Sequence, residues 1–489
     1  MRAPLAISRA AGALALLAAC AACGGTTGHG EPAAAPKPPV QHFLSRPDLR
    51  PPPVHVVVGA RGTAPGYVFI APKKEVDQAG PLILDDRGQV VWFHPLDTHG
   101  VTDFRVQRYR GKPVLTWWRG ETAKGIGNGR YVIYDESYHL IANVRAGHGL
   151  SGDIHEFLIT PRNTALFTVY RRVPADLSAL GGREDGKVEE GVVQEVDIKT
   201  GRVLFEWHSL PHISTDESYE PVPKDESEPF DYFHLNAVEQ DGDGALLVSA
   251  RHTHAIYKIR KRDGALLWRL GGKRSSFHVA SGASFAWQHD PRLHADGTLS
   301  LFDNAASRPA AGRESRAIVL RLDAKRRTAK LVRSFKHPAP LLSTSQGNAQ
   351  MLPDGHLFVG WGSNEYFTEF DRHGRVLLDA RFGGGGADSY RAYRFAWNGR
   401  PRDRPAVAAR AEGGRTIVFA SWNGATAVAR WRVLGGANAS RLAAIADAAK
   451  RGFETRIPLS SRVRYVEVQA LDAAGHVLRT SQPARVTSG

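Results

Sequence analysis

Cysteine is almost absent from this chain. Of 489 residues only Cys20 and Cys23 are cysteines, and both lie close to the N-terminus. The folded body therefore has neither a disulfide nor a thiolate metal site. Zinc fingers, iron–sulfur centres and cysteine nucleophiles are excluded, and the chemistry must be carried by other side chains.

Phosphate-binding motifs are also missing. The chain has no Gly-x-x-x-x-Gly-Lys-Ser/Thr loop and no dinucleotide fingerprint after a strand, so no nucleotide cofactor is expected. The formal net charge is +15, yet Lys and Arg are dispersed through turns and do not form a stripe with aromatic residues. We therefore expect no nucleic-acid partner. A dispersed positive charge suits anionic lipid head groups or an anionic small substrate, and an arginine-rich proteome explains it equally well.

A strand–turn–strand unit recurs along the chain. Its clearest copies centre on the turns Asp243-Gly244, Asp296-Gly297 and Asp354-Gly355, each followed by a short apolar strand. Six closing turns recur roughly every 50 to 65 residues, near the length of a kelch-like blade. No long helical period interrupts these strands. The pattern predicts an all-β fold with a six-bladed β-propeller over residues 51–400, because radial repetition leaves few exposed strand edges.

The two ends of the chain differ from this body. Residues 1–19 have the pattern of an export signal, and Leu17-Ala18-Ala19-Cys20 matches a lipoprotein cleavage box. We expect lipidation at Cys20, a disordered tether over residues 20–50, and a lipoprotein on the outer face of the cytoplasmic membrane. A plain secretory signal with an incidental cysteine is the alternative. No twin-arginine pair is present, which favours the general secretory route.

Residues 405–489 follow a Pro/Arg-rich linker and alternate apolar and polar positions. Strands are expected at 416–420, 427–433 and 465–471, with a short helical insert around 442–450. This pattern predicts a small C-terminal β-sandwich of the fibronectin type III or immunoglobulin kind. We assign it no chemistry.

Three histidines enter the first strand of successive units: His155, His234 and His289. A propeller brings equivalent positions of its units around one axis, so these side chains should meet. His252 and His254 could form a metal pair if they shared one face of a strand, but their motif lacks a carboxylate. We expect no metal site.

The order of five motifs resembles the arylsulfotransferase family, the bacterial arylsulfate sulfotransferases, over about residues 65–399. These motifs are Asp231-Tyr232-Phe233-His234-Leu235-Asn236, Ser249-Ala250-Arg251, Trp287-Gln288-His289-Asp290, Leu301-Phe302-Asp303-Asn304 and Ser345-Gln346-Gly347-Asn348. The resemblance implies a six-bladed propeller that moves a sulfuryl group from a phenolic sulfate donor to a phenolic acceptor. It also implies a covalent sulfohistidine, and neither phosphoadenosine phosphosulfate nor any other cofactor.

The resemblance also implies roles for particular residues. His289 becomes sulfated, Arg251 holds the sulfuryl oxygens, and His155 and His234 exchange protons with the phenols. Asn236 would hydrogen-bond a sulfuryl oxygen or orient a histidine, and either Thr344 or Ser345 supplies a hydroxyl. Asp290 and Asn304 would support His289, or else tie the turns of the blades.

Departures from the family keep other interpretations open. The well-known members carry their extra sandwich before the propeller and not after it, so the sequence does not fix the oligomeric state. A noncatalytic lipoprotein that binds phenolic or glycan ligands is the main alternative. A quinone-dependent dehydrogenase is disfavoured, because the tryptophan docking motifs and a vicinal cysteine pair are missing from the blades.

Overall fold

The computed structural model describes residues 37–225, 227–307 and 314–488. Their regular secondary structure is almost entirely β-strand, with short 3₁₀ turns at Ser178–Leu180 (η1) and Thr215–Glu217 (η2). In the described ranges no helix is long and apolar enough to cross a bilayer. The predicted all-β class is confirmed. The expected signal segment and Cys20 lie outside the described residues.

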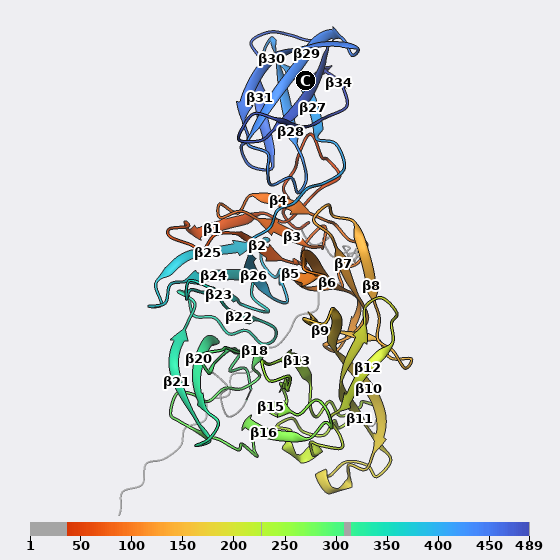
Figure 1. Ribbon diagram of the computed structural model, residues 1–489, viewed down its shortest axis with the longest axis vertical. Helices are drawn as coiled ribbons and strands as arrows, with labels where there is room; N and C mark the ends of the chain where they lie inside the picture. Colours follow the sequence, from red (N-terminus) through yellow and green to blue (C-terminus); the bar gives the residue numbers. More distant parts are fainter. Residues whose placement is uncertain (1–36, 226, 308–313, 489) are drawn as a thin grey trace, which may run out of the picture. The chain divides into compact units, whose positions relative to one another are not determined.

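Four- and five-stranded antiparallel sheets follow one another along the chain (Figure 1). One sheet joins the two ends of the body and has the order β26 (Ala392–Phe395), β2 (Tyr67–Ile70), β3 (Leu82–Leu84), β4 (Val90–Phe93). A second also joins distant segments and has the order β1 (Val54–Val58), β25 (Val376–Phe382), β24 (Tyr366–Phe370), β23 (Leu357–Gly360), β22 (Asn348–Met351).

The segment between those ends forms three further sheets. An eight-stranded sheet contains β5 (Val101–Tyr109), β6 (Lys112–Ala123), β7 (Ile126–Tyr134), β8 (Leu140–Val144), β9 (Gly152–Ile159), β10 (Thr164–Ala175), β11 (Gly186–Asp197) and β12 (Val203–His208). Its two four-stranded halves are joined by the single pair Gly129–Gly152. The next sheet is β13 (Leu235–Gln240), β14 (Leu246–Ala250), β15 (Ala255–Ile259), β16 (Leu266–Gly271). The last contains β17 (His278–Val279), β18 (His289–Leu293), β19 (Thr298–Asp303), β20 (Arg316–Asp323) and β21 (Thr328–Phe335).

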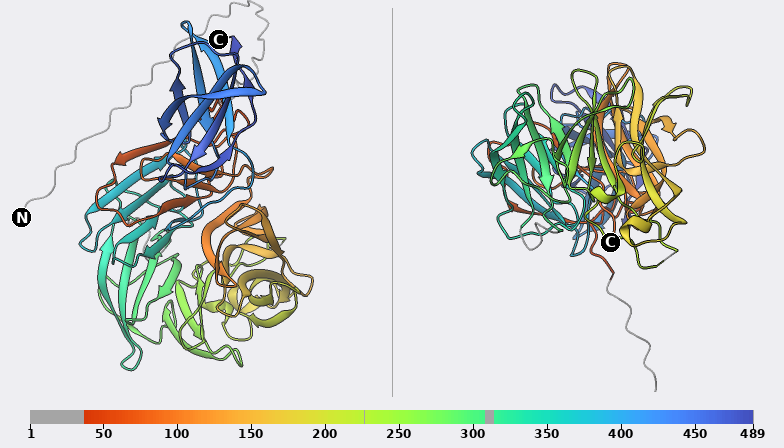
Figure 2. Two further views of the ribbon diagram at one scale, coloured as in Figure 1. Left: turned by 45° about the horizontal axis from the view of Figure 1, so that its top comes forward. Right: turned by 90° about the horizontal axis from the view of Figure 1, so that it is seen from below.

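The first strands of these units contact one another in a closed cycle. The order is β5, β9, β13, β18, β22, β26 and back to β5, so the sheets follow one another around a common centre (Figure 2). Both faces of the inner strands are covered by neighbouring sheets. On β14, Leu246 and Val248 pack into one core cluster while Leu247 packs into the next. Because both faces are buried, these strands are short runs of apolar residues and do not strictly alternate apolar with polar residues.

The repeated Asp-Gly turns have one local cause. Asp241 accepts hydrogen bonds from the backbone N–H groups of Asp243 and Ala245, and Gly244 takes a positive φ of 82°. A side chain would strain that left-handed position, whereas glycine adopts it freely. The predicted turns and following strands at residues 243, 296 and 354 are confirmed.

Two expectations at the ends are wrong. Residues 442–450, expected as a helix, form strand β30 (Arg441–Ala449), which pairs with β29 (Arg430–Asn438). Its Ala-rich composition favours a helix, but pairing in a sheet overrides that weak preference. The disordered tether does not reach residue 50, because Leu49 is buried and the Arg50 N–H donates to Gln78.

Two sheets at the C-terminus share one apolar core. One has the order β31 (Glu454–Pro458), β28 (Arg415–Ser421), β27 (Ala406–Glu412), β35 (Thr487–Ser488). The other contains β30, β29, β32 (Tyr465–Leu471), β33 (Val477–Thr480) and β34 (Ala484–Arg485). Val418 of the first sheet and Trp431, Val466 and Val468 of the second belong to the same buried cluster.

Candidate functional site

The three predicted histidines and Arg251 line one pocket, whose cavity volume is about 630 Å³. His155 lies on β9, His234 directly precedes β13, and His289 begins β18, so three of the contacting first strands deliver them. The ring centroids of His155 and His234 are 5.0 Å apart. The sequence prediction that these side chains converge is therefore confirmed by the geometry. All three histidines are at most 3% exposed.

The proton on His289 is fixed by its partners. Its Nδ1 atom lies 3.0 Å from the Trp287 carbonyl and 2.8 Å from the Asn304 Oδ1 atom. Both partners are acceptors, so Nδ1 carries the hydrogen and Nε2 keeps a lone pair. The backbone N–H of Gln346 approaches Nε2 at 3.3 Å, which is consistent with a lone pair at that atom. His289 therefore presents an unprotonated nitrogen to the pocket.

His155 and His234 each have a carboxylate behind the ring. His155 Nδ1 lies 2.5 Å from Asp153 Oδ2, and His234 Nδ1 pairs with Asp231 Oδ2. Each carboxylate also accepts the backbone N–H of its own histidine. The Nδ1 hydrogen is thus fixed on both rings, and Nε2 is left for the pocket. The His234 Nε2 atom is buried without a hydrogen-bond partner in the described structure.

Burial and nearby positive charge keep two of the histidines neutral. Burial, followed by the charge of Arg251, lowers the pKa of His234 and of His289 well below 6.5. A neutral imidazole keeps the lone pair on Nε2, which is the form that can act as a nucleophile.

Arg251 carries a partly buried charge without a direct carboxylate partner among the described residues. Within the described ranges no Asp or Glu oxygen lies within 4.0 Å of its guanidinium, and its buried Nε atom has no partner. The guanidinium instead stacks over the Trp287 ring at 4.3 Å and donates from Nη2 to His252 Nε2 at 3.0 Å. Buried charges are normally paired, so an arginine left free in a pocket is suited to an anionic ligand.

The remaining predicted residues separate into two groups. Ser345 lines the pocket, whereas the Thr344 hydroxyl lies 3.3 Å from Ser363 on the exposed side. Asn236 is absent from the pocket wall, and its Nδ2 donates to the Gln288 carbonyl at 2.7 Å. It therefore holds the backbone beside His289 and does not face the ligand. The expectation that Asn236 binds a sulfuryl oxygen is not supported.

Asn304 orients His289, but Asp290 belongs to a separate network. Directly below the pocket residues, three acids and three arginines pair across the ring of first strands: Asp103, Glu156, Asp290, Arg105, Arg292 and Arg391. Glu156 is the central acid, since all three arginines contact it. None of the six lines the pocket. The network fills the axis below the histidines with balanced charge.

Sequence reasoning missed Tyr390. This residue lines the pocket, is 1% exposed, and its hydroxyl is buried without a partner among the described residues. Its ring contacts His155 and His289, with centroid distances of 5.7 and 6.3 Å. Burial raises the pKa of Tyr390 well above 10, so the hydroxyl is a permanent donor. No motif marked this position, because it lies in the segment that closes the ring.

One group of side chains has ligand types suited to a metal. In the part of the chain that the structure describes, the ligand atoms of Asp231, His234 and His252 all lie within 4.8 Å of one another. However, His252 Nδ1 donates to the Asp231 carbonyl at 2.5 Å, and the Asp231 carboxylate holds His234. The guanidinium of Arg251 also lies against His252. Hydrogen bonds account for this group, and a cation there would face an arginine.

His252 and His254 do not lie on a strand as the sequence suggested. Both belong to a turn between β14 and β15, and His254 stacks on Tyr219 at a centroid distance of 4.2 Å. The assumed common strand face is therefore wrong for this pair.

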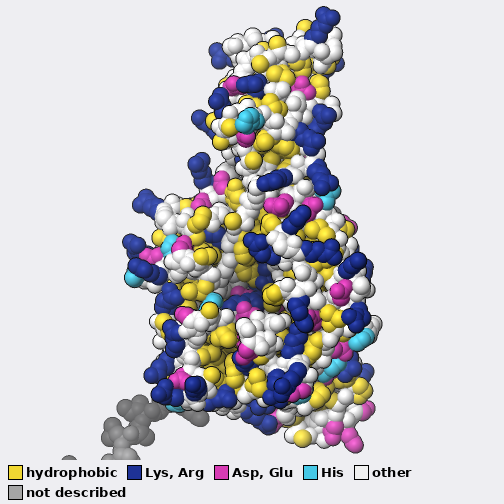
Figure 3. Space-filling model, viewed as in Figure 1, with side chains coloured by type: hydrophobic (Ala, Val, Ile, Leu, Met, Phe, Trp, Pro, Cys, Tyr) yellow, Lys and Arg dark blue, Asp and Glu magenta, His cyan; other side chains and the backbone are white. Residues whose placement is uncertain are grey.

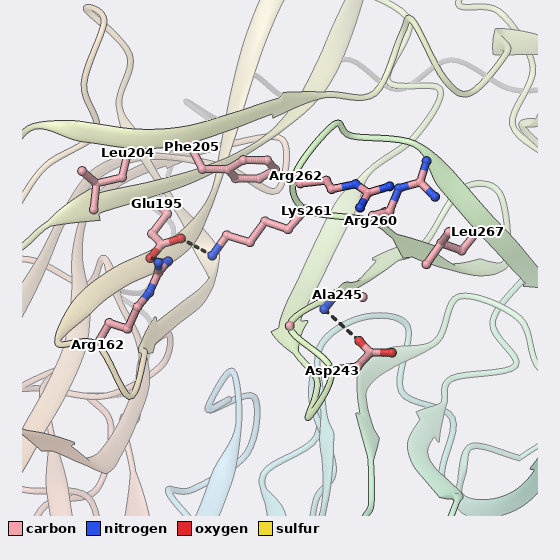
Figure 4. A pocket seen from close by; sticks show the side chains of 11 residues that line it. Arg162, Glu195, Leu204, Phe205, Asp243, Ala245, Arg260, Lys261, Arg262 and Leu267 are labelled. Atoms are coloured by element: carbon pink, nitrogen blue, oxygen red, sulfur yellow. Dashed lines mark hydrogen bonds and ion pairs between the residues drawn. The ribbon is translucent and has the colours of Figure 1, made fainter.

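A second, larger cleft lies away from the histidines, between the sheets of β10–β12 and β14–β16 (Figure 4). Its volume is about 830 Å³. Its charged walls are already paired, since both Arg162 and Lys261 contact Glu195. It has none of the unpaired polar groups that distinguish the histidine pocket, so we do not assign it the chemistry.

Basic side chains are spread over the surface with acidic ones among them on the face seen in Figure 3. No continuous basic stripe is visible on that face. This face therefore offers no sign of a nucleic-acid surface.

Comparison with known protein families identifies the family of this chain. The family model described as Arylsulfotransferase (ASST) matches residues 105–383, which is more than half of the chain. No curated protein matches. Similar solved structures include a Bacteroides caccae protein of unknown function, with 13% identity, coverage of 67% of this chain and 98% of that one, and a TM-score of 0.40.

Two further similar structures are enzymes by name. The periplasmic gluconolactonase PpgL of Pseudomonas aeruginosa has 13% identity, covers 86% of this chain and 96% of its own, and has a TM-score of 0.37. Virginiamycin B lyase of Staphylococcus aureus has 10% identity, 75% and 94% coverage, and a TM-score of 0.32. These likenesses carry no functional argument. The family match does, and the chain belongs to the arylsulfotransferase (ASST) family.

Proposed function

We propose that this protein is an aryl sulfotransferase that moves a sulfuryl group from a phenolic sulfate ester to a phenol by a ping-pong mechanism, through a sulfohistidine at His289. The carrying observation is that the guanidinium of Arg251, which has no direct carboxylate partner among the described residues, lines the same pocket as His289, whose Nε2 keeps its lone pair. A sulfuryl group is an anion with an electrophilic centre, so it needs both. Family membership supports the reaction class.

We further propose that the closed cycle of first strands is a six-bladed propeller in which the two halves of the eight-stranded sheet are separate blades. The single joining pair supports that division. The two C-terminal sheets with one core support a fibronectin-like sandwich over residues 405–489. The signal pattern and Cys20 support an exported lipoprotein anchored at the outer face of the cytoplasmic membrane.

In the first half-reaction, the Nε2 lone pair of His289 forms an N–S bond while the bond between sulfur and the phenolic oxygen breaks. Arg251 neutralises the sulfuryl oxygens, and its planar donors suit two of them at once. The phenolic oxygen departs as a phenolate. The hydroxyl of Tyr390 and the hydroxyl of Ser345 provide further donors on the pocket wall.

In the second half-reaction, an acceptor phenol occupies the same position. Its proton passes to the Nε2 of His155 or His234, its oxygen attacks sulfur, and the N–S electron pair returns to His289. The imidazolium then releases this proton to solvent, where the phenolate from the first step takes up a proton, so each cycle balances. The carboxylates Asp153 and Asp231 stabilise the imidazolium while it exists.

Intact-protein mass spectrometry tests this proposal. The purified protein is incubated with excess 4-nitrophenyl sulfate and no acceptor. We expect an acid-labile gain of about 80 Da, the mass of one SO₃, which added phenol discharges. His289→Ala should abolish it, and His294→Gln should not, because His294 bonds to Ser300 outside the pocket.

Failure to form the adduct with several aryl sulfates would refute the proposal. It would then favour a noncatalytic propeller that binds phenolic or glycan ligands.

A further inference from the structure

The polar group behind the ring differs in charge among the three pocket histidines. His155 and His234 have carboxylates at Nδ1, whereas His289 has the neutral amide of Asn304 at 2.8 Å. Resting on the function proposed above, we propose that Asn304 is a positioning residue that keeps the sulfohistidine reactive. Being neutral, it leaves the Nδ1 proton on the sulfated ring, so that the ring departs readily from sulfur.

The orientation of this amide is fixed by its other atoms. Asn304 Nδ2 donates to the carbonyls of Ser343 and Gln346, each at 3.0 Å. Carbonyl oxygens only accept, so the amide nitrogen must face them and Oδ1 must face His289. Asn304 is fully buried, and the hydroxyl of Ser315 donates to its backbone carbonyl at 2.7 Å. In the opposite orientation Oδ1 would face two carbonyl oxygens and both hydrogen bonds would be lost.

The chemistry depends on where the Nδ1 proton stays. Formation of the N–S bond uses the Nε2 lone pair, so the ring then holds Nδ1–H and a positive charge. Discharge breaks the N–S bond, returns the pair to Nε2, and leaves a neutral imidazole. A carboxylate at Nδ1 would stabilise that positive charge or accept the proton, and both effects make the ring a poorer leaving group. The amide oxygen is far too weak a base to do this.

The same logic suits the other two histidines. A histidine that exchanges protons must form an imidazolium and lose it again, and a carboxylate at Nδ1 stabilises this form. A nucleophile must stay unprotonated at Nε2 before attack, and an adjacent carboxylate would favour its protonation. The charge of the partner therefore divides the rings into one nucleophile and two proton carriers.

The decisive variant is Asn304→Asp, which puts a carboxylate behind His289 with almost no change of shape. We expect it to form the adduct of about 80 Da and to release it to phenol about tenfold or more slowly, since one pKa unit corresponds to a tenfold change. Asn304→Ser removes the same hydrogen bonds without adding charge. If the substitutions merely damage the structure, adduct formation should be slower in both variants. General damage should not make the adduct last longer in either variant.

A second readout does not depend on turnover. In protein labelled with ¹⁵N-histidine, the Asn304→Asp variant should raise the pKa of His289, and Asn304→Ser should not. If the pKa is unchanged, or if Asn304→Asp discharges its adduct as fast as the parent, the inference is overturned. If the parent itself never gains about 80 Da, it is the proposed function that fails, while the NMR comparison still reports on Asn304.

Discussion

Glu156 is the acid whose loss should cost the fold most. Its side chain is fully buried, with Arg292 Nη2 at 2.7 Å and Arg391 Nη1 at 3.0 Å, and it also contacts Arg105. These charges hold the pKa of Glu156 well below its usual range, although burial opposes them. Glu156→Gln preserves the shape but leaves three buried arginines facing two acids. Breaking a buried ion pair in this way typically costs about 3 to 5 kcal/mol.

Urea denaturation followed by tryptophan fluorescence measures this change at pH 7. Asp216→Asn is a suitable control, because the side chains of Asp216 and its partner Arg274 are 47% and 51% exposed and a surface pair contributes only about 0 to 1 kcal/mol. A loss for Glu156→Gln no larger than for Asp216→Asn would refute the reasoning. The pH dependence has a defined sign: a lowered carboxyl pKa adds stability above its unfolded value, about 4.3, which is lost as the pH falls further.

Three further predictions concern single side chains near the site. His252→Asn keeps a donor toward the Asp231 carbonyl but removes the ring nitrogen that accepts from Arg251. With Arg251 no longer held in place, inorganic sulfate should bind about tenfold or more weakly by calorimetry, and the longer side chain in His252→Gln should restore part of the affinity. Tyr390→Phe should lower kcat/KM about tenfold while leaving the melting temperature unchanged or higher, because the lost hydroxyl has no partner in the described structure. Burial raises the pKa of Glu239 to about 7, so Glu239→Gln should raise the melting temperature at pH 8 and not at pH 5; equal shifts at both pH values would contradict this.

Which residues converge followed from the repeat, but how they point did not. The sequence placed His155, His234 and His289 together because equivalent positions of a radial repeat face one centre. Regular strand alternation would place the side chain of Asn236 on the same face as that of His234. In the structure His234 has a left-handed φ of 49°, and the pairing of β13 with β14 shifts register between Leu235 and Ala237. That irregularity breaks the alternation and turns Asn236 toward Gln288.

The hydrogen-bond partners of the three histidine Nδ1 atoms could not be predicted from residue spacing in the sequence. Asp153 lies two residues before its histidine and Asp231 three, while Asn304 lies 15 residues after His289, directly after β19. Their pairing depends on side-chain rotamers and on turn geometry, which no period encodes. Tyr390 depends on the closure of the ring by the segment before β26, a contact between distant parts of the chain.

The network of six charges also bears on how substrates would enter and leave the pocket. Its side chains pair across the ring of first strands, none is more than 15% exposed, and they close the axis beneath the pocket. For the proposed sulfotransferase, we therefore expect a released phenol to leave by the route through which the acceptor enters, so that donor and acceptor compete for the same space. A high acceptor concentration should then inhibit the reaction.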